Sequence, residues 1–176
     1  MPPPNFDSSD FRETFGRFVT GVCVVTSFGP DGPSGLTANA VASLSLDPPL
    51  MIVCFDRSAR TLSAVEHSRR FGVHFLARAQ EELAARFASK RPEPEKFAGL
   101  DSAERSGVPL LEKTLGGFAC ELAELLPGGD HVIAVGKIVD LWASEGDPLV
   151  FFRGEYWTLG EHAPAPPEVD EALEGG

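Results

Sequence analysis

Apolar residues recur along this chain in short runs separated by turn-forming residues, a pattern that is typical of β-strands. Runs rich in β-branched residues occupy residues 21–27 and 50–55, and residues 71–76 alternate between apolar and other side chains. Later runs of the same character cover residues 108–111, 118–125, 131–142, 149–152 and 155–159, between clusters of Gly, Pro and Asp. Because strands dominate, we expect a mainly β fold, an antiparallel barrel with short flanking helices.

Helical spacing is confined to short segments. Asp10 followed by Glu13 has the spacing of a capping box, and phenylalanines recur on one helical face from Phe11 to Phe18. Further helices are expected around residues 62–65 and over residues 80–89. The segment that follows, RPEPEKFAGL, is charged and interrupted by proline, so we expect a surface loop there.

Residues 35–49, GLTANAVASLSLDPP, differ from the other runs because small side chains alternate with hydroxyl and amide groups. Small residues let the main chain lie close to a flat ligand, and the Ser, Thr and Asn side chains supply hydrogen-bond donors and acceptors. A GPDG turn joins this stretch to residues 21–27, which predicts an antiparallel pair of strands. Composition alone favours an ordinary strand and turn over a binding site.

The charge distribution separates a domain from a tail. The net charge is −11, and residues 161–176 carry acids without any Lys or Arg. We therefore expect one domain over residues 1–160 and a flexible, acidic, proline-rich tail over residues 161–176. Because an acidic surface repels phosphate backbones, nucleic-acid binding is disfavoured.

Cysteine usage and hydropathy indicate a cytoplasmic protein. Cys23, Cys54 and Cys120 are odd in number, widely spaced and placed in apolar runs, so we expect reduced core residues. The chain shows no basic and apolar leader and no apolar span long enough to cross a bilayer. We therefore expect neither export nor membrane insertion.

Common catalytic motifs are missing from the chain. GxGxxG, HExxH, CxxC, GxSxG and GxxxxGK do not occur, so the sequence predicts no doubly wound dinucleotide fold and no hydrolase, zinc or P-loop site. His74 lies in an alternating strand, and we expect it to face solvent or a hydrogen-bond partner rather than a ligand. Any redox chemistry must therefore come from a bound cofactor.

Several ordered segments nonetheless resemble one family. They are FRETFGRFVTGVCVVT, GLTANAVASLSLDPPLMIVCFDRSARTL, GVPLLEKTLGGFACEL, GGDHVIAVGKIVDL and PLVFFRGEYWTL, which together span nearly all of residues 11–159. In these segments the chain is similar to the flavin reductase-like family, small NAD(P)H:flavin oxidoreductases that supply reduced flavin to two-component monooxygenases. One departure is Thr20, where many relatives carry proline.

The resemblance implies a split β-barrel that binds FMN or FAD non-covalently, takes hydride from NADH or NADPH, and works as a homodimer with flavin sites near the subunit contact. His131 matches a histidine beside the nicotinamide and is the expected catalytic residue, and no metal site is implied. The cofactor-binding residues implied by the resemblance are Thr37, Ala38, Asn39, Ala40, Ser43, Asp56, Arg57, Ser58, Arg60, Thr61, Arg86, Phe87, Lys90 and Tyr156.

Two other functions stay open from the sequence. The same barrel can store or carry flavin, or bind another planar cofactor, without oxidising NAD(P)H; only as a reductase does it have a separate flavin-dependent monooxygenase as its expected partner. An oxidase of the related pyridoxamine phosphate oxidase type would need a more basic substrate pocket than the sequence shows. An assay of NAD(P)H oxidation with added flavin separates the reductase from the carrier.

Overall fold

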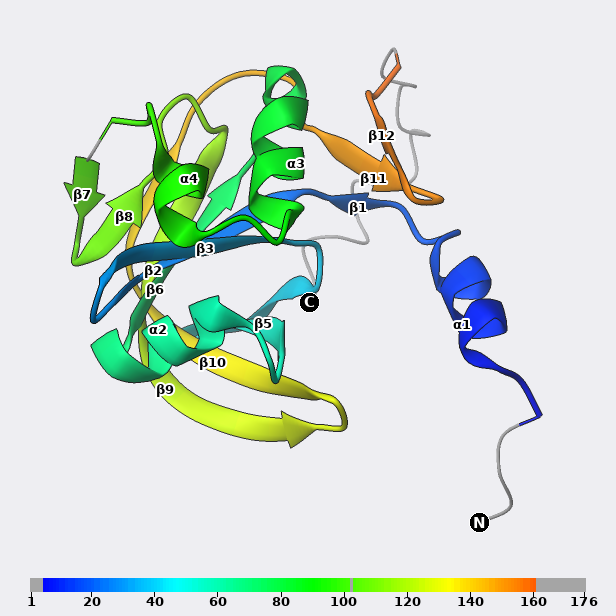
Figure 1. Cartoon of the computed structure of the whole chain (residues 1–176), viewed down its shortest axis with the longest axis horizontal. Helices are drawn as coiled ribbons and strands as arrows, with labels where there is room; N and C mark the ends of the chain where they lie inside the picture. The colour runs from blue at the N-terminus through cyan, green and yellow to red at the C-terminus, as the bar shows by residue number, and fades with distance from the viewer. Residues whose placement is uncertain (1–4, 102, 161–176) are drawn as a thin grey trace.

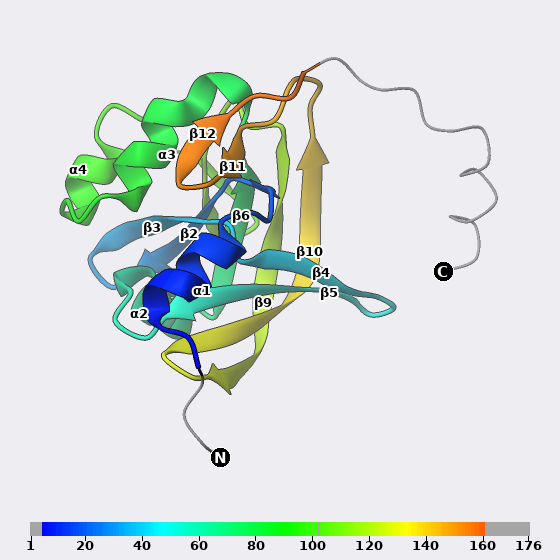
Figure 2. The same ribbon diagram turned by 90° about the vertical axis from the view of Figure 1, so that its right-hand side faces the viewer.

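An antiparallel sheet of seven strands, in the order β3-β2-β6-β9-β10-β5-β4, forms the body of the molecule (Figure 1). The computed structural model describes residues 5–101 and 103–160. The strands of this sheet are β2 (Cys23–Gly29), β3 (Gly32–Ala38), β4 (Val41–Leu46), β5 (Pro49–Asp56), β6 (Arg70–Phe75), β9 (Gly116–Gly128) and β10 (His131–Ala143). The sheet is strongly curled, and its two outermost strands, β3 and β4, are consecutive in the chain (Figure 2). The expectation of a mainly β fold is confirmed.

Alternation along the strands places one row of side chains in the core of the curled sheet. In β5, Met51, Val53 and Phe55 are buried while the residues between them are partly exposed, as the two-residue period of a strand requires. They meet Val25 and Phe71 from other strands in the main hydrophobic core. Burial of this apolar row is the main force that holds the sheet in its curled form.

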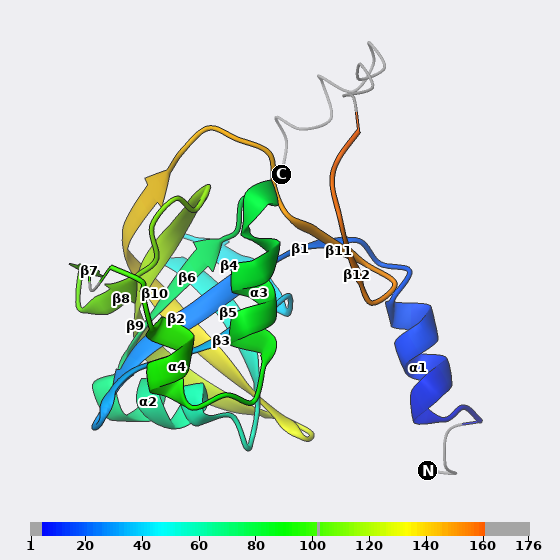
Figure 3. The same cartoon turned by 45° about the horizontal axis from the view of Figure 1, so that its top comes forward.

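Short helices flank the sheet near β3 (Figure 3). α2 (Arg60–Ser68) follows β5 and packs Leu62 and Val65 into the main core. α3 (Glu81–Ala88), preceded by the 3₁₀ turn η1 (Arg78–Gln80), contributes Ala84 and Phe87 to a second hydrophobic cluster. The short α4 (Glu93–Phe97) adds Phe97 to the same cluster. All three helices, α2, α3 and α4, thus lie against β3.

Smaller elements complete the fold. β7 (Ala103–Arg105) and β8 (Val108–Leu110) form a hairpin, and β1 (Thr20–Gly21), β11 (Val150–Phe152) and β12 (Glu155–Trp157) form a small sheet. α1 (Ser8–Phe15) stands away from the main sheet and has no buried residue (Figure 1). Its phenylalanine rings stack on one another, with the ring centroids of Phe11 and Phe15 5.7 Å apart.

The structure corrects one predicted helix start and one predicted loop. The N-terminal helix begins at Ser8 because Asp7 is its cap: the Asp7 carboxylate accepts from the N–H groups of Ser9 and Asp10. Asp10 is thus the inner partner of the capping box, and the predicted start was too late. The predicted loop RPEPEKFAGL contains α4, because Pro94 lies in the first turn of that helix, where proline is tolerated.

His74 is fully buried and faces hydrogen-bond partners, the second of the two environments expected for it. Its Nε2 lies 3.0 Å from Thr26 Oγ1 and 3.1 Å from the carbonyl oxygen of Pro109. β6 is buried on both faces, since β8 covers the face that alternation had assigned to solvent. Burial lowers the pKa of His74 to about 4, so the side chain is neutral at pH 7.

The cysteines, all within the described residues, are free, and Cys23 and Cys120 are buried while Cys54 is half-buried. Burial raises the pKa of the Cys23 and Cys120 thiols to about 12, which keeps both from acting as nucleophiles. Among the helices of the described residues, none has the length and apolar character needed to span a bilayer. The predicted tail over residues 161–176 lies outside the described residues.

Candidate functional site

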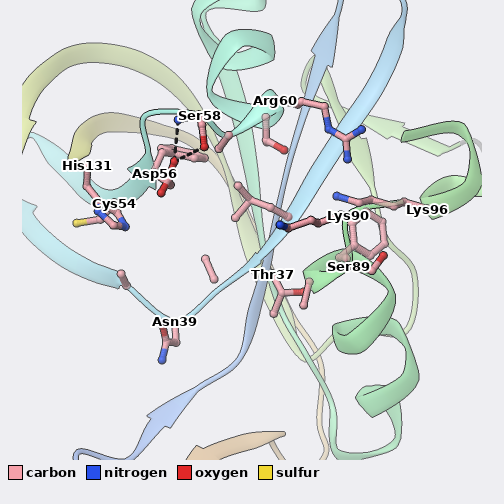
Figure 4. A pocket seen from close by; sticks show the side chains of 18 of the residues that line it. Thr37, Asn39, Cys54, Asp56, Ser58, Arg60, Ser89, Lys90, Lys96 and His131 are labelled. Carbon is pink, nitrogen blue, oxygen red and sulfur yellow. Dashed lines mark hydrogen bonds between the residues drawn. The ribbon is translucent and has the colours of Figure 1, made fainter. Parts of the chain in front are cut away.

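A cavity of about 590 Å³ opens where β3, the end of β5, the start of α2, the end of α3 and the start of β10 converge (Figure 4). Eleven of the residues expected to bind cofactor or donor line it. They are Thr37, Ala38, Asn39, Ala40, Asp56, Ser58, Arg60, Thr61, Phe87, Lys90 and His131. The structure thus brings together segments that are far apart in the chain.

The segment from Thr37 to Ala40 crosses the cavity wall between β3 and β4. Thr37 Oγ1 donates a hydrogen bond of 2.6 Å to the carbonyl oxygen of Ala84 in α3, which fixes one end of the segment. The Ala40 carbonyl oxygen accepts from the Cys54 N–H at 3.0 Å and fixes the other end. Between these anchors Asn39 is exposed, and its amide has no hydrogen-bond partner within the described part of the chain. Its donor and acceptor are therefore available to a ligand.

The loop that leads into α2 is held by Asp56. Its carboxylate accepts from the Ser58 N–H at 2.7 Å and from the Ser58 hydroxyl, and these bonds hold the pKa of Asp56 below its usual range, with a smaller contribution from the charge of His131. Ala59 precedes α2 and supplies no side-chain cap. The helix therefore presents its N-terminal N–H groups, beside the Ser58 hydroxyl, at the cavity wall, an arrangement that favours an anion.

One end of the cavity is cationic. Arg60, Lys90 and Lys96 gather on the same side of it in Figure 4. Lys96 is only 4% exposed, and its Nζ donates to the Gly35 carbonyl oxygen at 2.9 Å and lies 3.3 Å from Glu93 Oε1.

Glu93 ties this end to β3. Its Oε2 accepts from the Gly35 N–H at 2.9 Å, and its Oε1 lies 3.1 Å from Arg60 Nη2. Both backbone groups of Gly35 are thus held by the Glu93 and Lys96 side chains. Lys90, in contrast, has no hydrogen bond or ion pair with the described residues, so its charge is available to a ligand phosphate.

The opposite end of the cavity carries His131, which begins β10 and pairs in register with Asp56 of β5 (Figure 4). His131 Nδ1 lies 2.8 Å from Asp130 Oδ1, and this hydrogen bond is the main cause that lowers the pKa of Asp130. The contact orients the imidazole and leaves Nε2 for a ligand, because a ring nitrogen bound to a carboxylate is no longer available. The Cys54 side chain lies beside it.

Other residues expected to bind cofactor lie outside this lining. Ser43 lines a neighbouring, largely apolar cavity of about 450 Å³ that shares Asn39 with the first. Arg57 Nε donates to the Gly129 carbonyl oxygen at 2.9 Å, and Arg86 Nη1 donates to that of Ala98 at 3.0 Å. Tyr156 stacks edge-on against Phe151, 5.8 Å between ring centroids. The cofactor roles of these residues stay predictions.

Sequence reasoning missed part of the lining, above all Ser89, Glu93 and Lys96. Ser89 carried a usable signal, since it directly precedes Lys90 at the end of a predicted helix. Glu93 and Lys96 did not, because charged residues in a proline-containing segment look like solvent-exposed surface. Within the described residues no cluster of His, Cys, Asp and Glu is arranged to hold a metal ion.

Comparison with known proteins identifies the family to which the chain belongs. Residues 15–160 match the family model described as flavin reductase like domain. The chain belongs to the flavin reductase-like family. The matched residues contain every lining residue of the cavity, so the candidate site lies wholly within the family domain.

Two relatives in the flavin reductase-like family have names that state an activity. The reductase subunit HsaB of a flavin-dependent monooxygenase from Mycobacterium tuberculosis is 37% identical over 172 residues, which cover 96% of this chain and 91% of HsaB. The FMN reductase (NADH) SmoA of Agrobacterium fabrum is 38% identical over 155 residues, which cover 88% of this chain and 87% of SmoA.

Two solved structures extend the comparison to the fold. Component B of nitrilotriacetate monooxygenase from Mycobacterium thermoresistibile superposes with a TM-score of 0.85 at 35% identity, covering 94% of each chain. The NADH:FAD oxidoreductase SgcE6 of Streptomyces globisporus, solved in complex with NAD and FAD fragments, superposes with a TM-score of 0.78 at 30% identity, covering 96% of this chain and 100% of SgcE6.

Proposed function

We propose that this protein is an NAD(P)H:flavin oxidoreductase that reduces FMN or FAD by direct hydride transfer and supplies the reduced flavin to a separate monooxygenase. Relatives named as a monooxygenase reductase subunit, an FMN reductase (NADH) and an NADH:FAD oxidoreductase support this assignment. The observation that carries it for this chain is the single cavity that joins residues 37–40, a cationic end and His131.

The cavity fits a flavin nucleotide in size and chemistry. Its volume of about 590 Å³ falls within the range of roughly 300–1,000 Å³ that cofactor sites occupy. Ala38 and Ala40 allow a flat ring to approach the main chain, and the exposed amide of Asn39 matches the polar edge of such a ring. Lys90, Ser58 and the start of α2 suit a phosphate.

A flavin bound here would supply the redox chemistry, accepting a hydride from the nicotinamide and passing two electrons on. The protein's residues bind and orient, and none of them has to act as an acid or base in the hydride step. Asn39 hydrogen-bonds the ring edge, while Lys90 and Ser58 hold the phosphate. His131, fixed through Asp130, positions the nicotinamide, because rate depends on the angle and distance of approach. Exposed Asn39, Asp56 and Lys90 leave the site open enough for reduced flavin to depart.

Two further structural features belong to this proposal. The curled sheet is a split β-barrel, which is supported by β3 and β4 at the two ends of the strand order and by their link at residues 39–40. The domain, residues 1–160, works as a homodimer, which is supported by the exposed phenylalanines of α1 and the apolar cavity of about 450 Å³ beside the site.

A steady-state assay that crosses NADH and NADPH with FMN, FAD and riboflavin tests the proposal. The expected result is nicotinamide oxidation that requires added flavin and shows a preference for one nicotinamide. Flavin binding without any acceleration of NAD(P)H oxidation would instead favour the flavin carrier. Absence of flavin binding would remove both functions.

A further inference from the structure

Glu93 places a carboxylate at the cationic end of the cavity of about 590 Å³, where the proposed function needs a phosphate to bind. Its side chain lines the cavity together with Arg60, Lys90 and Lys96, and only 16% of it is exposed. The proposed function gives this carboxylate no role, although like charges repel each other strongly in a partly buried site. Glu93 is therefore an anion already seated where a second anion has to bind.

Both carboxylate oxygens of Glu93 are engaged. Oε2 accepts from the Gly35 N–H at 2.9 Å, which fixes the side chain against β3. Oε1 lies 3.1 Å from Arg60 Nη2 and 3.3 Å from Lys96 Nζ, and it is buried without a hydrogen-bond partner among the described residues. One carboxylate oxygen thus faces two cations at once, and its contact with them is mainly electrostatic.

The three cations at this end of the cavity differ in how much charge they offer to a ligand. Arg60 and Lys96 are each paired with Glu93. Lys90 has no hydrogen bond or ion pair with the described residues. Because a cation that is already balanced by a carboxylate attracts phosphate less than a free one, Lys90 is the main source of attraction.

We propose that Glu93 is a built-in counter-anion that takes up the charge of Arg60 and Lys96 and so limits how much a flavin's phosphate adds to binding. This inference rests on the proposed function and deepens it. Contacts to the flavin ring dominate affinity, and riboflavin, which has no phosphate, is accepted as a substrate alongside FMN. A charge placed against one part of a ligand is a general way to set specificity.

The same arrangement suits the release of reduced flavin to a second protein. A phosphate held by three free cations would leave slowly, because differences in affinity among related complexes appear mostly in the rate of dissociation. Glu93 lowers that affinity without removing the cations. Lys96 keeps its place beside Gly35, and the cavity keeps its shape.

Glu93→Gln tests this role, because glutamine can still accept from the Gly35 N–H while it removes the negative charge beside Arg60 and Lys96. We would measure dissociation constants of riboflavin and FMN by titration. FMN should bind the variant about tenfold more tightly, the size expected for one restored charge-assisted contact, while riboflavin changes by less than about twofold. Glu95→Gln is the matched control, since Glu95 lies on the same helix, α4, is exposed and does not line the cavity.

Inorganic phosphate gives a second readout that needs no flavin. In Glu93→Gln the buried Lys96 ammonium group loses its carboxylate, which should lower the midpoint of thermal unfolding. A phosphate ion that takes the place of the carboxylate should restore part of this loss, because a ligand of the folded state stabilises it. Phosphate should therefore raise the midpoint of Glu93→Gln more than that of the wild type or Glu95→Gln, relative to sodium chloride at equal ionic strength.

Tighter FMN binding with riboflavin binding unchanged supports the proposal. FMN affinity that is equal in the wild type and Glu93→Gln, or lower in the variant, would overturn it, and so would an equal change for both flavins, which would come from the fold. If the variant does not fold, the wild type decides: FMN and riboflavin affinities within about tenfold support the proposal, and a larger ratio contradicts it. A wild type that binds no flavin, while phosphate stabilises the variant selectively, loses the proposed function alone.

Discussion

Lys96 shows how a charged residue can be structural although its sequence context resembles a loop. Its ammonium group is buried because it meets two partners, the Gly35 carbonyl oxygen and the Glu93 carboxylate. A buried charge is tolerated only when it is paired and hydrogen-bonded. Sequence patterns do not reveal such a contact, since Gly35 is 61 residues away from Lys96.

Replacing Lys96 by Met keeps the length of the side chain and removes its charge. Because the Gly35 carbonyl loses its donor and Glu93 loses a neighbouring cation, we expect the free energy of unfolding to fall by about 2–3 kcal/mol. Urea denaturation measures it. Lys90→Met is the control, since Lys90 is exposed and unpaired within the described residues and its loss should leave stability within about 0.5 kcal/mol. Equal stability of both variants would contradict the structural role of Lys96.

His131→Ala tests the nicotinamide contact. We expect kcat/KM for NADH or NADPH to fall about tenfold, because the loss of a positioning contact appears in transition-state binding. The flavin dissociation constant should barely change, since Asn39 and Lys90 remain. Steady-state kinetics and a flavin titration measure the two quantities. Unaltered kinetics would remove His131 from the site.

His74 predicts a pH dependence of stability. Its pKa falls from the ordinary value of 6.5 to about 4 on folding, so below pH 6.5 the unfolded chain binds a proton that the folded protein excludes. The stability that the neutral side chain contributes is complete above pH 6.5 and is lost progressively as the pH falls through 4. The loss amounts to about 3 kcal/mol.

Urea denaturation between pH 7 and pH 4 measures this loss, and His74→Gln should show a shallower decline over that range. The carboxylates whose pKa is lowered on folding, such as Asp56 and Asp130, start from 3.8, so their contribution to stability falls from about pH 5 downward in both proteins and cancels in the comparison of wild type with variant. Parallel pH profiles for the wild type and the variant would mean that His74 does not titrate as its burial implies.

At the scale of elements, the strands follow the apolar periodicity closely, whereas helix starts depend on details of side-chain bonding. The run at residues 50–55 is β5 with one residue added at each end. The helix start moved from Asp10 to Ser8 because both Asp7 and Asp10 are suitable caps, and pattern alone does not choose between them. α4 was missed since proline in a first turn is compatible with helix.

The candidate site, like the fold, was predictable from the sequence only in part. Residues 37–40, His131 and three residues around the start of α2, Ser58, Arg60 and Thr61, came from the family resemblance, and they lie on one cavity. Glu93 and Lys96 were out of reach because their roles arise only when α4 packs under Gly35. Arg86 was expected near the cofactor, and only the structure shows that its guanidinium lies on the other side of α3.

The packing of α3 on β3 depends on the missing side chain of Gly35. A Cβ there would come within 2.6 Å of Phe87 Cε1 and 2.8 Å of Cδ1. We expect Gly35→Ala to cost about 1–3 kcal/mol of stability and to weaken flavin binding, because α3 would have to shift together with Ser89 and Lys90. Thermal denaturation and flavin titration measure both effects. Gly21→Ala is the control, since no atom of the residues that the structure describes lies within 4 Å of a Cβ at that position.

At the scale of the whole molecule, exposed phenylalanine side chains are concentrated in α1 and the residues beside it. Phe11, Phe15 and Phe18 are each more than half exposed, with Phe18 at 67%. Phe18 also lines the apolar cavity that adjoins Asn39. An exposed apolar patch of this kind marks an interaction surface, and a second copy of the chain is the proposed occupant.

We expect the protein to sediment at about twice the chain mass of 18.8 kDa. Phe18→Asp should shift it toward the monomer and weaken flavin binding, because a charge placed in an apolar contact opposes association. Analytical ultracentrifugation gives the mass. A monomeric wild type would contradict the homodimer, and a Phe18→Asp dimer with normal flavin affinity would place the contact elsewhere.

The proposed flavin cavity, which is the cavity of about 590 Å³ that residues 37–40 and His131 line, has its ammonium groups at one end. The Asp56 and Asp130 carboxylates lie beside His131 at the other end. A phosphorylated ligand therefore meets attraction at one end and repulsion at the other before it touches the wall. This uneven electrostatic field orients the ligand as it diffuses toward the cavity, so that the phosphate approaches the end with the ammonium groups. Added salt should slow that capture while the seated pose stays the same.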